Sequence, residues 1–114
     1  MGISKTALFS DEQNELADLA KVLAHPARIA ILQYLLEAQS CVNSALVKDF
    51  GLSQPTVSQH LNALKASGLI QGSVRGTSVY YCIHPERWHA VADLFATFFK
   101  QPVALESACN SPKL

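Results

Sequence analysis

Residues 51–70, GLSQPTVSQHLNALKASGLI, contain the pattern that decides the fold. Gly51 suits the left-handed residue that ends one helix, and Ser53 follows closely as an N-cap for the next. That next helix is expected over residues 54–67, with Gly68 as its C-terminal stop. Two helices joined by a tight turn that contains glycine predict a helix-turn-helix.

The residues on both sides extend this pattern to a winged helix-turn-helix. Apolar residues recur at helical spacing before the motif, and two runs of β-branched and aromatic residues follow it with a turn at Arg75-Gly76. The predicted class is mainly α with a small β-hairpin wing and five helices. We expect helices over residues 10–23, 26–36, 43–50, 54–67 and from residues 84–86 onward, and strands over residues 69–74 and 78–83.

Length and composition indicate one globular domain. The chain has 114 residues, of which 49% are hydrophobic, and its apolar runs are shorter than the ~20 residues of a membrane span. Residues 1–101 are expected to form the winged helix-turn-helix domain, and residues 102–114, with two Pro and two Ser, a flexible tail. The first ten residues lack the apolar core of a signal peptide, so a cytoplasmic location is expected.

Charge and motifs narrow the function. The nine basic and nine acidic residues balance, yet residues 40–82 carry Lys48, Lys65 and Arg75 against Asp49 alone, a net charge of +2. The sequence has no glycine-rich phosphate loop, no metal-hydrolase motif and no nucleophile elbow, so we do not expect an enzyme. Three cysteines are an odd number, which argues against a disulfide framework.

The helix expected over residues 54–67 has one apolar and one polar face. Val57, Leu61 and Leu64 recur at i, i+4 and i+7, so they should face the core. Lys65 is the only formally charged residue of this helix. The opposite face can donate and accept hydrogen bonds to base edges and phosphates, which predicts a DNA-reading surface. Its residues are Gln54, Thr56, Ser58, Gln59 and Asn62.

The turn of the predicted wing adds a second candidate contact. Arg75 and Thr77 place a cation and a hydroxyl at an exposed turn, where they suit a DNA backbone contact. The alternative is an ordinary solvated hairpin turn. The preceding helix-turn-helix favours the DNA interpretation.

Three segments resemble one known family. LAHPARIAIL at residues 23–32, LSQPTVSQHL at residues 52–61 and ASGLI at residues 66–70 are similar, in order and spacing, to the ArsR/SmtB family of repressors. The resemblance extends from about Leu16 to Phe99. It implies a homodimer whose first and last helices form the interface and whose recognition helices enter successive major grooves of double-stranded DNA.

The resemblance also assigns surfaces. The expected dimer interface consists of Leu16, Leu19, Leu23, Trp88, Val91, Phe95, Phe98 and Phe99. The apolar stripe from Trp88 to Phe99 independently predicts a partner. For His60 the resemblance suggests a phosphate contact, and the equal alternative is a half-buried hydrogen bond within the protein.

The functional prediction is a sequence-specific DNA-binding transcriptional regulator. The sequence favours a homodimeric repressor that leaves a two-fold symmetric operator when a metal, a metalloid or a thiol modification acts on it. The alternatives are a winged-helix module that binds protein and a regulator without an effector. Apolar or acidic residues on the polar face would indicate protein binding, and that face has neither.

Family effector sites match this sequence poorly. The resembled family often binds soft metals through Cys-x-Cys before the recognition helix, and here that position is Cys41-Val42-Asn43. The carboxylates and histidines of a second familiar site, on the last helix, are absent. Their places hold Pro85, Arg87, Phe98 and Gln101.

Geometry suggests another effector site. A short strand before the helix-turn-helix would join the wing and bring Cys41 beside Cys82. The two thiols could bind a soft metal or metalloid ion with Cys109 or His84 as a third ligand, or they could oxidise reversibly. The alternative is that both are small buried hydrophobic residues.

A weaker metal candidate lies on the last helix. Glu86, His89 and Asp93 share one face at i, i+3 and i+7 and could ligate an ion across a dimer, since they are chemically adequate for zinc or manganese. The same pattern is typical of a solvated polar face.

Overall fold

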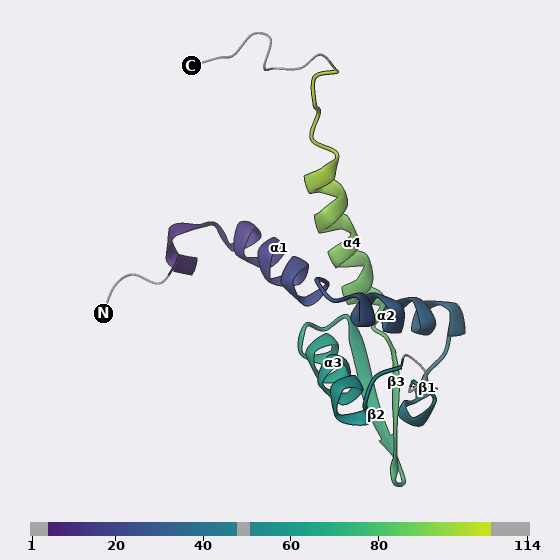
Figure 1. Ribbon diagram of the computed structural model, residues 1–114. Coiled ribbons are helices and arrows are strands. Elements are labelled where there is room, and N and C mark those ends of the chain that lie inside the picture. Colours follow the sequence, from purple (N-terminus) through teal and green to yellow (C-terminus); the bar gives the residue numbers. More distant parts are fainter. Residues whose placement is uncertain (1–4, 48–50, 106–114) are drawn as a thin grey trace.

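The computed structural model describes residues 5–47 and 51–105, and within them it shows a helical body with a three-stranded sheet (Figure 1). Two short 3-10 turns, η1 (Lys5–Leu8) and η2 (Ser44–Leu46), accompany the main elements. The helices are α1 (Asp11–Val22), α2 (Pro26–Ala38), α3 (Gln54–Ala66) and α4 (Pro85–Phe99), and the strands are β1 (Val42–Asn43), β2 (Ile70–Arg75) and β3 (Ser78–Ile83).

The prediction of five helices is wrong for the described part of the chain, which contains four α-helices. A helix was expected over residues 43–50, and Ser44–Leu46 instead form η2, while residues 48–50 lie outside the described residues. The amide of Val47 donates to the carbonyl of Ser44 at 3.1 Å, three residues back. This bond is tighter than the i to i−4 bond of an α-helix, so the segment forms a single tight turn.

The sheet confirms the predicted wing and the predicted third strand. Its order is β1-β3-β2 and all pairs are antiparallel. Arg75 pairs with Ser78, so the hairpin turn consists of two residues and lies one residue later than expected. Gly76 is the first of them and has φ 63°, a value that glycine adopts without steric cost and that tight hairpin turns require.

The core is formed by side chains from every helix and strand. α2 runs through its middle, and its buried residues are Ile31, Leu32 and Leu35. The predicted inner face of α3 is confirmed, because Val57, Leu61 and Leu64 are buried. The remaining core residues are Leu19, Val42, Val47, Leu69, Ile70, Tyr81 and Val91.

α1 and α4 extend away from this body (Figure 1). A capping box at Ser10 starts α1, and the His84 side chain accepts from the Arg87 amide at the start of α4. None of the helices in residues 5–47 and 51–105 has the length and apolarity to cross a membrane. Residues 102–105 contain no helix or strand and residues 106–114 are not described, so the flexible tail stays a prediction.

Candidate nucleic-acid interface

The outward face of α3 is a continuous set of polar side chains. Gln54, Ser58, Gln59 and Asn62 are exposed, as is Lys65 near the C-terminal end. The helix contains no carboxylate. Because its inner face is fixed in the core, the exposed side chains point outward from a rigid element, which suits direct contact with another molecule.

Local interactions hold the start of α3. Ser53 is the N-cap and accepts from the Thr56 amide at 3.4 Å, and the two hydroxyls lie 2.8 Å apart. Thr56 is therefore half-buried and already bonded, unlike its exposed neighbours on this face. Gly68, with φ 85°, follows the helix and turns the chain into the wing.

His60 is bonded within the protein. Arg28 Nε donates to His60 Nδ1 at 3.0 Å, and Arg28 Nη1 donates to the Val22 carbonyl at 3.0 Å. The His25 ring centroid lies 5.5 Å from that of His60. Burial first, then the charge of Arg28 and that of His25, lower the pKa of His60. The structure thus shows the alternative in which His60 is half-buried and its Nδ1 atom accepts a hydrogen bond within the protein. A contact between His60 and a phosphate stays a prediction.

Sequence reasoning did not single out Arg28 as a positioning residue. Its guanidinium connects the end of α1 to the recognition helix, and its partner His60 is 32 residues away in sequence. No local pattern predicts a contact over such a separation. The only signal was that Arg28 falls inside the LAHPARIAIL segment.

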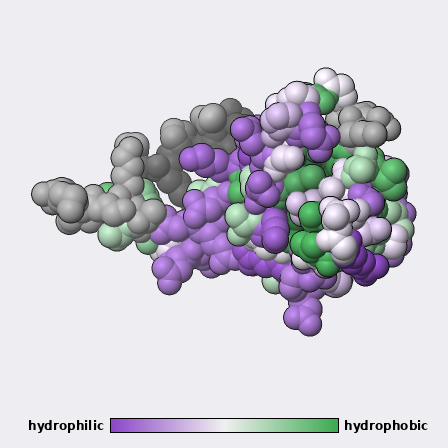
Figure 2. Space-filling view, turned by 90° about the horizontal axis from the view of Figure 1, so that it is seen from below, coloured by the Kyte–Doolittle hydropathy of each residue, from purple (hydrophilic) through white to green (hydrophobic). Residues whose placement is uncertain are grey.

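The wing tip is exposed as predicted. Arg75 and Thr77 are both exposed, and the Arg75 guanidinium lies 5.0 Å from the centroid of the Tyr80 ring. Figure 2 views the molecule from below, where the wing tip and α3 lie, and hydrophilic residues gather over much of this side beside a smaller hydrophobic area. The wing and α3 can therefore present polar groups together.

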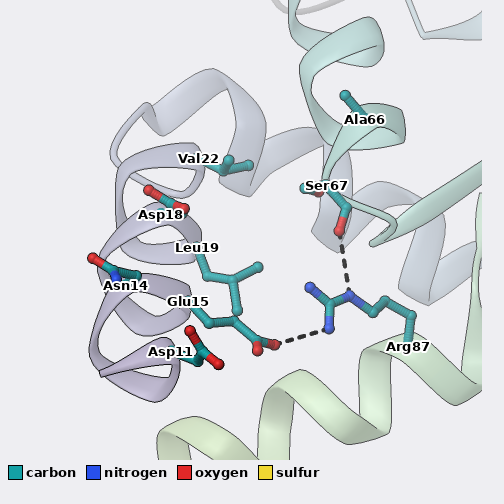
Figure 3. A pocket seen from close by; sticks show the side chains of 9 residues that line it. All are labelled: Asp11, Asn14, Glu15, Asp18, Leu19, Val22, Ala66, Ser67 and Arg87. Carbon is teal, nitrogen blue, oxygen red and sulfur yellow. Dashed lines mark hydrogen bonds and ion pairs between the residues drawn. The ribbon is translucent and has the colours of Figure 1, made fainter. Parts of the chain in front are cut away.

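Arg87 ties α4 to both α1 and the end of α3. Its Nη1 lies 3.1 Å from Glu15 Oε1, and its Nε donates to the Ser67 carbonyl at 3.3 Å (Figure 3). The side chains surround a pocket of about 390 Å³. This contact holds the helices of the expected dimer interface against the recognition helix.

The residues expected at the dimer interface differ in exposure. Phe98 and Phe99 are 54% and 74% exposed, whereas Leu19 and Val91 are 3% and 6% exposed. The last two are covered within the protomer, so they can offer little surface to a partner. Leu16, Leu23, Trp88 and Phe95 are half-buried. The dimer interface itself stays a prediction.

The two thiols lie together as predicted. Val42 pairs with Tyr81, which places Cys41 opposite Cys82 across the ladder. Cys41 is exposed and Cys82 is half-buried. Burial, followed by a side-chain hydrogen bond with Cys41, raises the pKa of Cys82.

The described residues of one protomer contain no three-ligand metal site. No three His, Cys, Asp or Glu side chains there converge on a point that could hold a metal ion. Cys41, Cys82 and His84 therefore form no such group in the described residues. The Nδ1 atom of His84 accepts from the Arg87 amide at 3.2 Å. Glu86, His89 and Asp93 likewise form no such group within one protomer, and a site that they complete across a dimer stays a prediction. Cys109 lies outside the described residues.

Comparisons with known proteins agree with this architecture. Residues 25–71 match the family model described as bacterial regulatory protein, arsR family. The chain is 47% identical over 64 residues to the HTH-type transcriptional repressor SmtB of Mycobacterium tuberculosis, which covers 56% of this chain and 47% of that protein. The chain therefore spans about half the length of SmtB.

Two further matches cover more of both chains. The biofilm growth-associated repressor of Xylella fastidiosa is 30% identical over 86 residues, 75% of each chain. A solution structure from Mycobacterium bovis superposes with a TM-score of 0.60 at 26% identity and covers 94% of this chain and 97% of that one. It is described as a homodimeric winged helix-turn-helix DNA-binding domain of a possible ArsR-family regulator. With its winged helix-turn-helix fold and these matches, the chain belongs to the ArsR/SmtB family of bacterial regulatory proteins.

Proposed function

We propose that this protein is a sequence-specific DNA-binding regulator that acts as a homodimer in the cytoplasm and represses transcription from a two-fold symmetric operator. The observation that carries the proposal is the outward face of α3. Gln54, Ser58 and Gln59 are exposed hydrogen-bonding side chains on a helix without a carboxylate. Amide and hydroxyl groups of this kind bond to base edges in the major groove, where each base pair has a distinct pattern.

Charge at the edges of this face supports the same function. Lys65 at the end of α3 and Arg75 at the wing tip are both exposed cations. Cations beside a neutral reading face can contact phosphates and fix the position of the helix, while the neutral side chains select the sequence. In this proposal Thr77 adds a hydroxyl contact to the backbone.

The dimer and the sign of regulation have separate support. The exposed aromatic side chains of α4, Phe98 and Phe99, favour a protein partner, and the related M. bovis domain is described as homodimeric. SmtB and the X. fastidiosa relative are both named repressors. A homodimer would present two copies of α3 to two half-sites one helical turn apart.

Binding to a site selected from a random double-stranded pool tests the proposal. Fluorescence anisotropy should give an affinity that falls steeply with salt. A dimer that uses Lys65 and Arg75 of each protomer contacts four phosphates, which predicts a slope of log K against log salt of about −3 to −4. A binding constant that does not depend on salt would rule out phosphate contacts and with them the proposal.

Two variants separate base reading from backbone contact. Gln59→Ala should reduce discrimination between the selected site and a scrambled one by about 5- to 150-fold for each half-site. Arg75→Ala should weaken both sites equally and make the salt slope about 2 less steep, because a dimer loses two cations. Gln33→Ala, at an exposed position of α2, is the matched control. If Gln59→Ala behaves like Gln33→Ala, α3 does not read the sequence.

A further inference from the structure

Cys41 and Cys82 are close enough for covalent chemistry. Val42 pairs with Tyr81 in the antiparallel ladder, so Cys41, one residue before Val42, faces Cys82, one residue after Tyr81. Both side chains line the same groove. Opposed residues of such a ladder have Cβ atoms about 4.5–5.5 Å apart, and a disulfide needs about 3.5–4.5 Å. A displacement of ~1 Å therefore suffices to join the two sulfurs.

The two thiols differ in their access to solvent. Cys41 is exposed and can meet a reagent directly, whereas Cys82 is half-buried. Burial and the hydrogen bond with Cys41 raise the pKa of Cys82, so its sulfur stays protonated to higher pH. The difference in exposure assigns the first attack on a reagent to Cys41, and the raised pKa of Cys82 makes its later attack on Cys41 the slower step.

A groove of about 530 Å³ runs from this thiol pair to α4. Leu35, Leu36 and Trp88 line it together with both cysteines. This volume is within the usual range of small-molecule sites, and such sites are mostly apolar with few polar groups. The wall also contains the polar side chains of Gln39, Ser40, Gln71 and His89. Because thiols react with soft electrophiles and peroxides more readily than these groups do, the groove suits a small, largely apolar molecule with a thiol-reactive end.

We propose that Cys41 and Cys82 form a dithiol site that reduces an apolar organic hydroperoxide held in this groove and closes to an intramolecular disulfide. The Cys41 thiolate attacks the terminal peroxide oxygen, the O–O bond breaks, and the alkoxide takes up a proton and leaves as an alcohol. Cys41 is then a sulfenic acid. The Cys82 sulfur attacks the Cys41 sulfur, the S–O bond breaks and water leaves.

The overall reaction is balanced. Two thiols and one hydroperoxide become one disulfide, one alcohol and one water, so the dithiol loses the two electrons that the peroxide gains. The reaction needs no metal and no DNA. Its failure would therefore leave the proposed function in place, and a failure of DNA binding would leave this reaction in place.

The test uses the full reduced chain carrying Cys109→Ser, so that only two thiols remain. One equivalent of cumene hydroperoxide should lower the mass by about 2 units and yield a linked pair of peptides containing Cys41 and Cys82. Dithiothreitol should reverse both changes. With Cys82→Ser the reaction should stop at a sulfenic acid on Cys41 that dimedone traps, and with Cys41→Ser the mass should stay unchanged.

A second arm tests the groove. Hydrogen peroxide has no apolar group, so it should close the disulfide at least about 10-fold more slowly than cumene hydroperoxide if apolar burial contributes ~1.4 kcal/mol. Leu36→Ala should slow the closure of the disulfide by cumene hydroperoxide and leave the closure by hydrogen peroxide unchanged. Leu94→Ala is the matched control, because Leu94 is equally half-buried and does not line the groove. Circular dichroism checks that each variant is folded.

Three results would overturn the proposal. The first is the absence of a Cys41–Cys82 link after treatment of the folded wild-type chain. The second is a link only between different chains. The third is equal rates for the two peroxides in folded wild type and in Leu36→Ala, which would show that the groove holds no hydroperoxide.

Discussion

α3 and α4 each bury one face in the same core, and they differ in what remains outside. α3 leaves neutral polar side chains such as Gln59 and Asn62, while α4 leaves Phe98 and Phe99. Polar groups stay hydrated until a partner offers matching donors and acceptors, whereas exposed aromatic rings gain free energy from any apolar cover. In the proposed function, the outer residues of each helix, and not its packing, make α3 a nucleic-acid surface and α4 a protein surface.

The largest expected effect separates the two faces of α3. Leu64 is fully buried and Asn62 is exposed on the same helix. Leu64→Ala leaves a cavity and should lower the free energy of unfolding by about 2–5 kcal/mol. Asn62→Ala should change it by less than ~0.5 kcal/mol. Urea denaturation measures the free energy of unfolding of both variants. Similar losses would show that α3 does not have one face packed in the core and one face free of structural contacts.

The next effect tests the aromatic face of α4. Phe98→Asp adds a charge to the expected interface twice in a symmetric dimer, so the dimer dissociation constant should rise about 30-fold or more. Sedimentation velocity measures the change. Val103→Asp is the control, because Val103 is 85% exposed and lies beyond the helix. An unchanged dimer would place the interface elsewhere and leave the phenylalanines without a partner.

A smaller effect concerns the link between α4 and α3. Arg87→Gln removes the bond to the Ser67 carbonyl and the ion pair with Glu15, and should lower the free energy of unfolding by ~1 kcal/mol. Glu15→Gln removes only the exposed ion pair, so its effect should stay below ~0.5 kcal/mol and disappear in high salt. Thermal unfolding at two salt concentrations separates the two contributions. A larger loss in Glu15→Gln would assign the link to the ion pair instead.

The smallest effect is the pH dependence that His60 gives to α3. The folded protein lowers the pKa of His60, so below its ordinary value of about 6.5 the unfolded chain binds the proton first. Stability should therefore be highest above this value and fall as the pH decreases from about 7.5 to about 5.5.

Thermal melts of wild type and His60→Asn at both pH values measure this contribution. Asn offers an oxygen acceptor to Arg28 and does not titrate, while the other histidines titrate in both proteins. Wild type should lose more stability on acidification. An equal loss would assign the pH dependence to other groups.

Patterns that depend on neighbouring residues were predicted from the sequence. The expected helix at residues 54–67 is Gln54–Ala66 in the structure, and its buried residues follow the predicted i, i+4, i+7 spacing. The pairing of Cys41 with Cys82 was also predicted, because strand addition to a wing fixes which residues meet. The helical period determines which residues of α3 are buried, and the strand register determines that Cys41 meets Cys82.

Contacts that depend on tertiary distance were not predicted. The bonds from Arg28 to His60 and from Arg87 to Ser67 join residues 32 and 20 positions apart, and side-chain reach across packed helices decides them. The sequence also suggested that Leu19 faces a partner, whereas it packs into the core of its own protomer. An apolar stripe shows that a residue needs cover and does not show which surface supplies it.

Arg75 at the wing tip is already engaged before any DNA arrives. Its guanidinium lies over the Tyr80 ring, a contact that contributes about 0.5–1 kcal/mol at an exposed site. A phosphate that draws the guanidinium away must first replace this contact, so the tyrosine acts as an internal competitor for the cation. The competition is the same for every DNA sequence. In the proposed complex, this contact thus weakens binding to operator and random DNA equally and leaves unaltered the choice that α3 makes among sequences.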